Sequence, residues 1–148
     1  MAFVFPFFGP KANRSGVMPV AVVGRLDGTV GNSGDTTFSF GGYPQKGYLS
    51  KFIVSQAVLM TSGGAVTAVV QKYDASANAA VVLTAAVDLL TATQVAREGY
   101  AIELLSTLSQ AQRTLDVGDT LEVKVTAAST VTGQPTDFFV TAELLVAE

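Results

Sequence analysis

Two residue types that supply much of protein chemistry are absent from this 148-residue chain. It contains no cysteine, so neither disulfides nor thiolate metal sites can form. It also contains no histidine, the commonest general acid/base and the usual zinc ligand. Ser-His-Asp and Cys-His catalytic arrangements are therefore excluded. We expect a protein that is not an enzyme and needs no cofactor or metal.

Charge is also scarce, with 14% charged residues against about 25% in ordinary soluble domains. The net charge is −3, and the first twenty residues hold only the basic Lys11 and Arg14. Nucleic-acid binding needs a clustered basic footprint, so we expect no nucleic-acid partner. No apolar run approaches the ~18–20 residues of a membrane span, so we expect no membrane partner. The 49% hydrophobic content instead favours a surface that other protein chains cover.

Residues 1–20 are expected to form an extended hydrophobic N-terminal arm. Three prolines in this segment disfavour a helix or a central strand. The predicted subunit or capsid interface consists of Phe3, Phe5, Phe7, Phe8 and Val20. Burying each phenylalanine stabilises by about 1.5–3 kcal/mol, which is comparable with the cost of ordering the segment. The arm should therefore order only against an apolar surface, either on its own domain or on a neighbouring subunit or capsid.

Residues 21–148 are predicted to form a single all-β domain, an antiparallel β-sandwich. Val and Thr, which favour strands, make up 37 of the 148 residues. Short alternating segments separated by turn residues indicate about eight short strands. The pattern is clearest over 121–125 and 138–146, where apolar and polar residues alternate.

Two other segments carry more specific predictions. In the strand expected over 48–60, Tyr48, Ser50, Phe52 and Val54 should share one face, opposite Leu49, Lys51 and Ile53. Residues 61–64 are expected to be the turn of a hairpin. Residues 84–97 should form a long connection with at most one or two helical turns.

The remaining candidates for chemistry are carboxylates, one Ser-Lys pair and a glycine-rich loop. Asp116 and Asp119 are best explained as turn residues around a glycine. Asp27 and Asp35 flank the loop 28–34, but two carboxylates lack the dense spacing of a calcium loop. That loop does not match a nucleotide-binding fingerprint, and we expect it to be flexible, closely packed or near an oligomer axis.

The other candidate pairs have little support from the sequence. Ser50 and Lys51 are neighbours in an expected strand, so they should point to opposite faces and form no catalytic pair. Glu98 and Glu103 would act as a carboxylate pair only if the fold brought them to the required separation.

Three stretches resemble those of small virion proteins of tailed bacteriophages. They are residues 46–54 (KGYLSKFIV), 115–125 (LDVGDTLEVKV) and 133–137 (GQPTD). The resemblance runs over residues 46–148, about two thirds of the chain, and implies a jelly-roll or similar β-sandwich. It also implies a homotrimer that decorates or cements a capsid surface, with the major capsid protein as partner and the arm as anchor.

The alternative is a host- or carbohydrate-recognition module of a phage fibre or adhesin. Such a module would present clustered exposed aromatic side chains, or amide side chains on loops. The four tyrosines, Tyr43, Tyr48, Tyr73 and Tyr100, are spread over separate expected elements.

Overall fold

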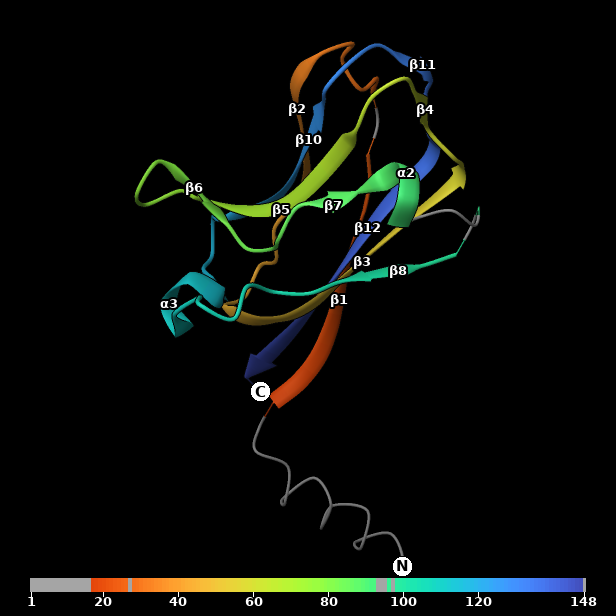
Figure 1. Ribbon diagram of the computed structural model, residues 1–148. Helices are drawn as coiled ribbons and strands as arrows, with labels where there is room; N and C mark the ends of the chain where they lie inside the picture. Colours follow the sequence, from red (N-terminus) through yellow and green to blue (C-terminus); the bar gives the residue numbers. More distant parts are fainter. Residues whose placement is uncertain (1–16, 27, 93–95, 97, 148) are drawn as a thin grey trace, which may run out of the picture.

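A computed structural model describes residues 17–26, 28–92, 96 and 98–147, and its regular structure is almost entirely β (Figure 1). The strands are β1 (Val17–Arg25), β2 (Gly34–Gly41), β3 (Gly47–Val58), β4 (Thr61–Ser62), β5 (Val66–Asp74), β6 (Ala79–Val82), β7 (Val87–Asp88), β8 (Tyr100–Ile102), β9 (Thr114–Leu115), β10 (Thr120–Ala127), β11 (Val131–Gly133) and β12 (Thr136–Ala147). The helices in these ranges are α2 (Leu89–Ala92) and α3 (Gln110–Arg113). The predicted all-β class is confirmed.

Two antiparallel sheets form the two layers seen in Figure 1. Sheet A has the strand order β1-β12-β3-β8, with β9 paired to one end of β3. Sheet B has the order β2-β10-β5-β6, with β7 paired to β5. The short strands β4 and β11 pair with each other in a separate small sheet.

The two sheet paths contain eight strands, in chain order β1, β2, β3, β5, β6, β8, β10 and β12. These eight strands pair as a long hairpin that has been rolled up. The first strand pairs with the last (β1 with β12), and the second pairs with the seventh (β2 with β10). The third pairs with the sixth (β3 with β8), and the fourth pairs with the fifth (β5 with β6). This order, split over two facing sheets, is that of a jelly roll.

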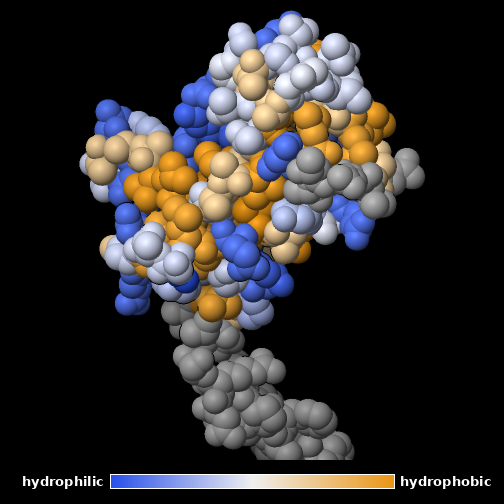
Figure 2. Space-filling view, viewed as in Figure 1, coloured by the Kyte–Doolittle hydropathy of each residue, from blue (hydrophilic) through white to orange (hydrophobic). Residues whose placement is uncertain are grey.

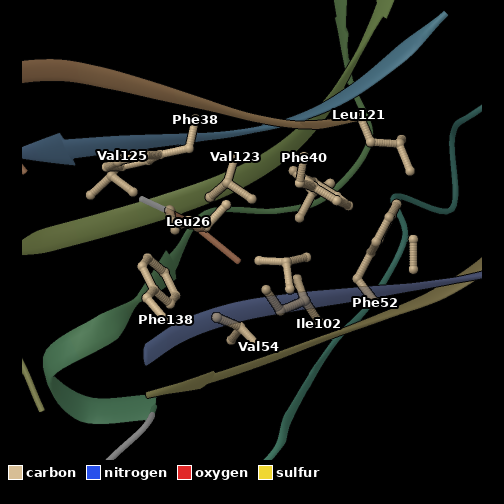
Figure 3. Packing of buried hydrophobic residues seen from close by; sticks show 14 of the residues in the cluster. Leu26, Phe38, Phe40, Phe52, Val54, Ile102, Leu121, Val123, Val125 and Phe138 are labelled. Atoms are coloured by element: carbon tan, nitrogen blue, oxygen red, sulfur yellow. The ribbon is translucent and has the colours of Figure 1, made fainter. Parts of the chain in front are cut away.

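The core lies between the two sheets and is filled by every second side chain of their long strands. Leu121, Val123 and Val125 of β10 are buried, as the alternation of residues 121–125 predicts. Figure 3 shows these side chains and Phe38 of sheet B pointing toward Phe52 and other residues of sheet A. The side chains between them point outward and form the outer faces of the two sheets.

The alternation predicted for β3 fails at Ser50. Leu49 is fully buried together with Phe52 and Val54, so these three side chains share the inner face. The register of β3 against β12 shifts here, since Lys51 is opposite Glu143 whereas Leu49 is opposite Leu144. A β-bulge adds one residue to a strand and reverses the faces that follow it. The predicted faces were therefore wrong on one side of the bulge.

Two other sequence expectations also need correction. Residues 61–64 do not turn a hairpin, because β3 and β5 belong to different sheets and Thr61–Ser62 forms β4. β1 begins at Val17, so residues 17–20 belong to sheet A and not to the arm. In the connection 84–97, the described part contains the single short helix α2, as expected, and also the short strand β7, which was not expected.

Candidate interaction surface

The outer face of sheet A, called face A below, presents apolar side chains to solvent. Val23 of β1 is 61% exposed, and Pro19 and Ala21 beside it are exposed too. The neighbouring strands add the half-buried side chains of Tyr48, Ile53, Phe139 and Leu145. A large apolar area on a sheet surface is typical of protein contact.

The strand register places a charged row between two largely apolar rows on face A. Across β1, β12 and β3 the rows are Pro19–Leu145–Tyr48, Ala21–Glu143–Lys51 and Val23–Thr141–Ile53. In the middle row, the Lys51 ammonium lies 3.9 Å from the Glu143 carboxylate, and the Lys51 side chain is 57% exposed. The middle of face A thus carries one charged row, and a second exposed ion pair, Arg25 with Asp137, lies at its end.

The bulge in β3 gives Glu143 a second partner. The Ser50 hydroxyl donates a hydrogen bond to Oε1 of Glu143, while Lys51 approaches Oε2. Ser50 and Lys51 were expected to point to opposite faces, and this prediction is wrong because both side chains contact the same carboxylate. Glu143 organises this polar group, and neither contact pairs Ser50 with Lys51.

A shallow hollow lies at the end of face A near the start of β12. It has a volume of about 250 Å³ and is lined by Ser55, Gln56, Ala57, Asp137 and Phe139. Arg25 forms an ion pair with Asp137 at 3.3 Å beside it. The hollow has an apolar side, formed by Ala57 and Phe139, and a polar side.

The outer face of sheet B, called face B, is different in character. It is mostly polar, with Asp35, Thr37, Ser39, Thr67, Gln71, Glu122, Lys124 and Thr126, and it also carries Val69 and the exposed Val82. Several of these groups pair with one another. Lys124 lies 2.7 Å from Asp35, and Gln71 donates a 2.7 Å hydrogen bond to Glu122. Face B is therefore a typical solvated sheet surface.

Apolar side chains also gather across the middle of the view in Figure 2, over β5, β6 and β8. On this side the sheets meet at an isolated bridge between Thr84 and Leu104. Val81, Leu90 and Leu104 are partly buried and pack against the core. This area is the margin of the core, so it gives a weaker case for a contact surface than face A.

The structure places the predicted interface residues as follows. Phe3, Phe5, Phe7 and Phe8 lie outside the described residues, so their interface role stays a prediction. Val20 lies in β1, is half-buried and packs against the core of its own domain. The strand β1, which follows the arm in the sequence, is therefore fixed by packing against its own domain.

The turn 116–119 has the structural role that the sequence predicts. The Asp119 carboxylate accepts a hydrogen bond from the Asp116 N–H at 3.0 Å, and Gly118 has a φ of 98°. A positive φ of this size favours glycine. Asp119 also accepts from the Ala75 N–H at 3.1 Å, so it joins this turn to the loop after β5.

A buried lysine beside Asp119 was not anticipated. Lys72 shares the inner face of β5 with Val70, and its side chain is 3% exposed. Its ammonium donates to the Thr114 carbonyl of β9 at 2.7 Å and lies 3.5 Å from Asp119. Lys72 thus connects sheet B to a strand of sheet A. The cluster therefore has a structural role inside the domain. The only sign of it in the sequence was a lysine at an inward position of an alternating strand.

The remaining acidic candidates are dispersed. Asp35 pairs with Lys124 and accepts from the Thr126 hydroxyl at 2.6 Å, and Asp27 lies outside the described residues. The Lys124 contact, followed by the Thr126 hydroxyl, holds the pKa of Asp35 below its usual 3.8. Glu98 and Glu103 are exposed at either side of β8. Within the described ranges, no group of three or more Asp or Glu side chains could hold a metal ion.

The glycine-rich loop 28–34 is closely held where the structure describes it. Val30 is buried in the core. Its N–H donates to the Gln134 side chain at 2.8 Å, and the Gln134 amide donates back to its carbonyl at 3.0 Å. The Gly31 N–H donates to the Thr36 hydroxyl at 2.9 Å. Of the three expectations for this loop, close packing is confirmed only at Val30 and Gly31, since the other residues of 28–34 are exposed.

The four tyrosines lie on separate parts of the fold. Tyr48 is on face A, and Tyr73 is on the outer side of β5. Tyr100 is in β8, and Tyr43 follows β2 and packs against the core. No aromatic platform is formed by these four residues.

Comparisons with known proteins add no relative. No family model matches the chain, and no curated protein or solved structure matches it. Across the described residues, none of the helices has the length and apolar character needed to cross a membrane.

Proposed function

We propose that this chain is a structural virion protein that decorates or cements a phage capsid by binding between coat subunits. It would work by contact alone, as a subunit of a larger assembly on the capsid surface. The phage setting rests on the resemblance of residues 46–54, 115–125 and 133–137 to small virion proteins. The jelly-roll strand order supports it, since viral capsid proteins commonly use this fold.

The observation that carries the proposal is the contrast between the two outer faces. Face B pairs its charged and polar groups with one another. Face A exposes apolar side chains such as Val23, at 61%, over three adjoining strands. In a chain with 14% charged residues, such a face favours burial against protein.

The arm supplies the contact with the coat in this proposal. Its four phenylalanines stand within residues 3–8, and residues 9–16 separate them from β1. A short apolar segment at the start of an edge strand can reach beyond its own domain. The homotrimer implied by the resemblance stays a prediction.

Recognition of a host or a carbohydrate receives less support. One feature expected of that function is a cluster of exposed aromatic side chains, the other being amides on loops. Tyr48 and Tyr73 lie on the outer sides of different sheets. A jelly roll is also found in lectins, so the fold alone does not separate the two functions.

The proposal is tested on phage particles whose genome encodes the chain. Mass spectrometry of purified particles should find the chain in many copies, at a fixed ratio to the coat protein. Tagged full-length chain should also sediment with particles that lack it. A variant with Phe3, Phe5, Phe7 and Phe8 changed to Ser should lose this binding, while the matched Phe→Leu variant should keep most of it. Absence of the chain from purified particles would overturn the proposal.

A further inference from the structure

The charged row of face A is complementary to a second copy of itself. We propose that face A is the contact surface of a two-fold homodimer, in which Lys51 of each copy lies opposite Glu143 of the other. The inference rests on the proposed function, because it names the partner that covers the exposed face, and it puts a dimer in place of the homotrimer that the resemblance implies. The starting observation is the pair of neighbouring, opposite charges on β3 and β12.

The charge pattern selects one orientation of the two-fold axis. An axis that runs along the strands, between β12 and β3, places β12 of one copy over β3 of the other. Each row then meets the same row, so Glu143 faces Lys51 at two equivalent places. An axis across the strands would place Glu143 opposite Glu143, and like charges in an interface are unfavourable. The favoured orientation is the isologous contact of a closed dimer, with the sheets packed in the aligned manner.

The same orientation pairs the apolar rows. Leu145 and Tyr48 share a row within one copy, as do Thr141 and Ile53. In the dimer, Leu145 of one copy therefore lies opposite Tyr48 of the other, and Thr141 lies opposite Ile53. The four charges form an alternating square at the centre, with apolar contact on both sides. Desolvation of these charges is offset only because each has an opposite charge in its own copy and another across the interface.

The hollow at the end of face A also fits this arrangement. Phe139 lies opposite Ser55 of the other copy, and Ser55 lines the hollow of about 250 Å³. Each Phe139 ring can therefore enter the hollow of the other copy. An aromatic side chain that fills a pocket is a common anchor of protein interfaces.

The size of face A is sufficient for a weak but specific dimer. Three long strands and the short β8, about 4.8 Å apart and about 30 Å long, give roughly 500 Å² per copy. The total of roughly 1,000 Å² is the lower limit for a specific interface. We expect dissociation constants in the micromolar range rather than an obligate dimer.

The test uses charge reversal in the full-length chain. Lys51→Glu makes the central row wholly negative, and Glu143→Lys makes it wholly positive. Each variant alone should be monomeric by light scattering, with dimerisation weakened at least about tenfold, a loss of about 1.4 kcal/mol. Mixing the two variants should restore a one-to-one heterodimer, because each reversed charge then meets its opposite. A folding defect in either variant cannot produce this recovery.

The matched control is Lys124→Glu, which breaks the Lys124–Asp35 ion pair on face B and should leave the dimer mass unchanged. The inference would be overturned by a wild-type chain that stays monomeric up to about 100 μM, a concentration well above micromolar dissociation constants. A trimeric mass would overturn it too, as would single variants that remain dimeric or a mixture without heterodimer. If the chain is monomeric but still binds particles, only the dimer proposal is contradicted. If the chain is a dimer but is absent from particles, only the proposed virion function is contradicted.

Discussion

The ammonium of Lys72 lies 3.5 Å from the carboxylate of Asp119, and the two side chains are 3% and 4% exposed. The carboxylate also accepts hydrogen bonds from two backbone N–H groups, those of Ala75 and Asp116. One buried pair thus fixes two turns and, through the Thr114 carbonyl, the end of sheet A.

Asp119→Ala should therefore be among the most destabilising single substitutions in this chain. It leaves the Lys72 charge buried without its nearest carboxylate and frees two N–H groups. Removing one partner of a buried ion pair typically costs about 3–5 kcal/mol. Urea unfolding followed by circular dichroism measures the loss. The matched control is Asp116→Ala in the same turn, whose side chain is 55% exposed and pairs with an exposed Lys46. That change should cost under about 1 kcal/mol, and equal losses in both variants would contradict the assignment.

Gly24→Ala should destabilise the corner where β1 passes β2. A Cβ at Gly24 would stand 1.9 Å from the Cβ of Phe40, which is close to the backbone and cannot simply rotate away. Overpacking of this kind costs about 1–3 kcal/mol or more. Gly63→Ala is the control, because its nearest neighbour would be 3.8 Å away. Thermal unfolding should show a lower midpoint for Gly24→Ala alone. Similar midpoints for both variants would mean that the two sheets separate easily at this corner.

Gln134→Ala should release the glycine-rich loop. The side-chain amide of Gln134 satisfies both backbone groups of the buried Val30. A buried backbone group left unsatisfied costs about 1–3 kcal/mol. Hydrogen exchange of the Val30 amide should accelerate far more than that of strand amides in β10. Gln45→Ala, at an exposed loop position, should leave this exchange unchanged. Continued protection of Val30 in Gln134→Ala would show that burial alone holds the loop.

Lys124→Ala should raise the pKa of Asp35. The Lys124 contact is the largest cause of its lowered pKa, ahead of the Thr126 hydroxyl. Since the folded-state pKa lies below 3.8, this carboxylate favours folding above about pH 4. That contribution is lost as the pH falls through the lowered pKa. Carboxyl-carbon NMR titration should show the change at Asp35 only. Asp74 is the internal control, because its pKa is lowered mainly by the Ser76 hydroxyl.

The fold class followed from the sequence wherever local alternation was undisturbed. In β10 and β12, residues such as Val123 and Val140 alternate with polar neighbours, and their burial was predicted correctly. The pairing of β1 with β12 was not predictable, since it joins residues 17–25 to 139–147 and leaves no local pattern. The bulge at Ser50 was also invisible, because an inserted residue shows only in the register with a partner strand.

The site was predictable only in part. The turn role of Asp119 followed from the neighbouring glycine, but its partner Lys72 is distant in sequence. Helix α3 carried a signal that was available, since Ser109 and Gln112 have capping-box spacing and form both of its hydrogen bonds. Face A could not be predicted, because its rows come from three strands whose order the sequence does not contain.

The pairing of β1 with β12 has a consequence for biosynthesis. β12 lies between β1 and β3 in sheet A, yet it is the last of the described strands to be synthesised. Until the ribosome has released residues 136–147, β1 and β3 have unpaired edges and no neighbour between them. A stalled or truncated nascent chain therefore exposes strand edges that can join other chains. Productive folding must await nearly the whole described chain, and during that interval β1 and β3 are natural sites for chaperones to shield.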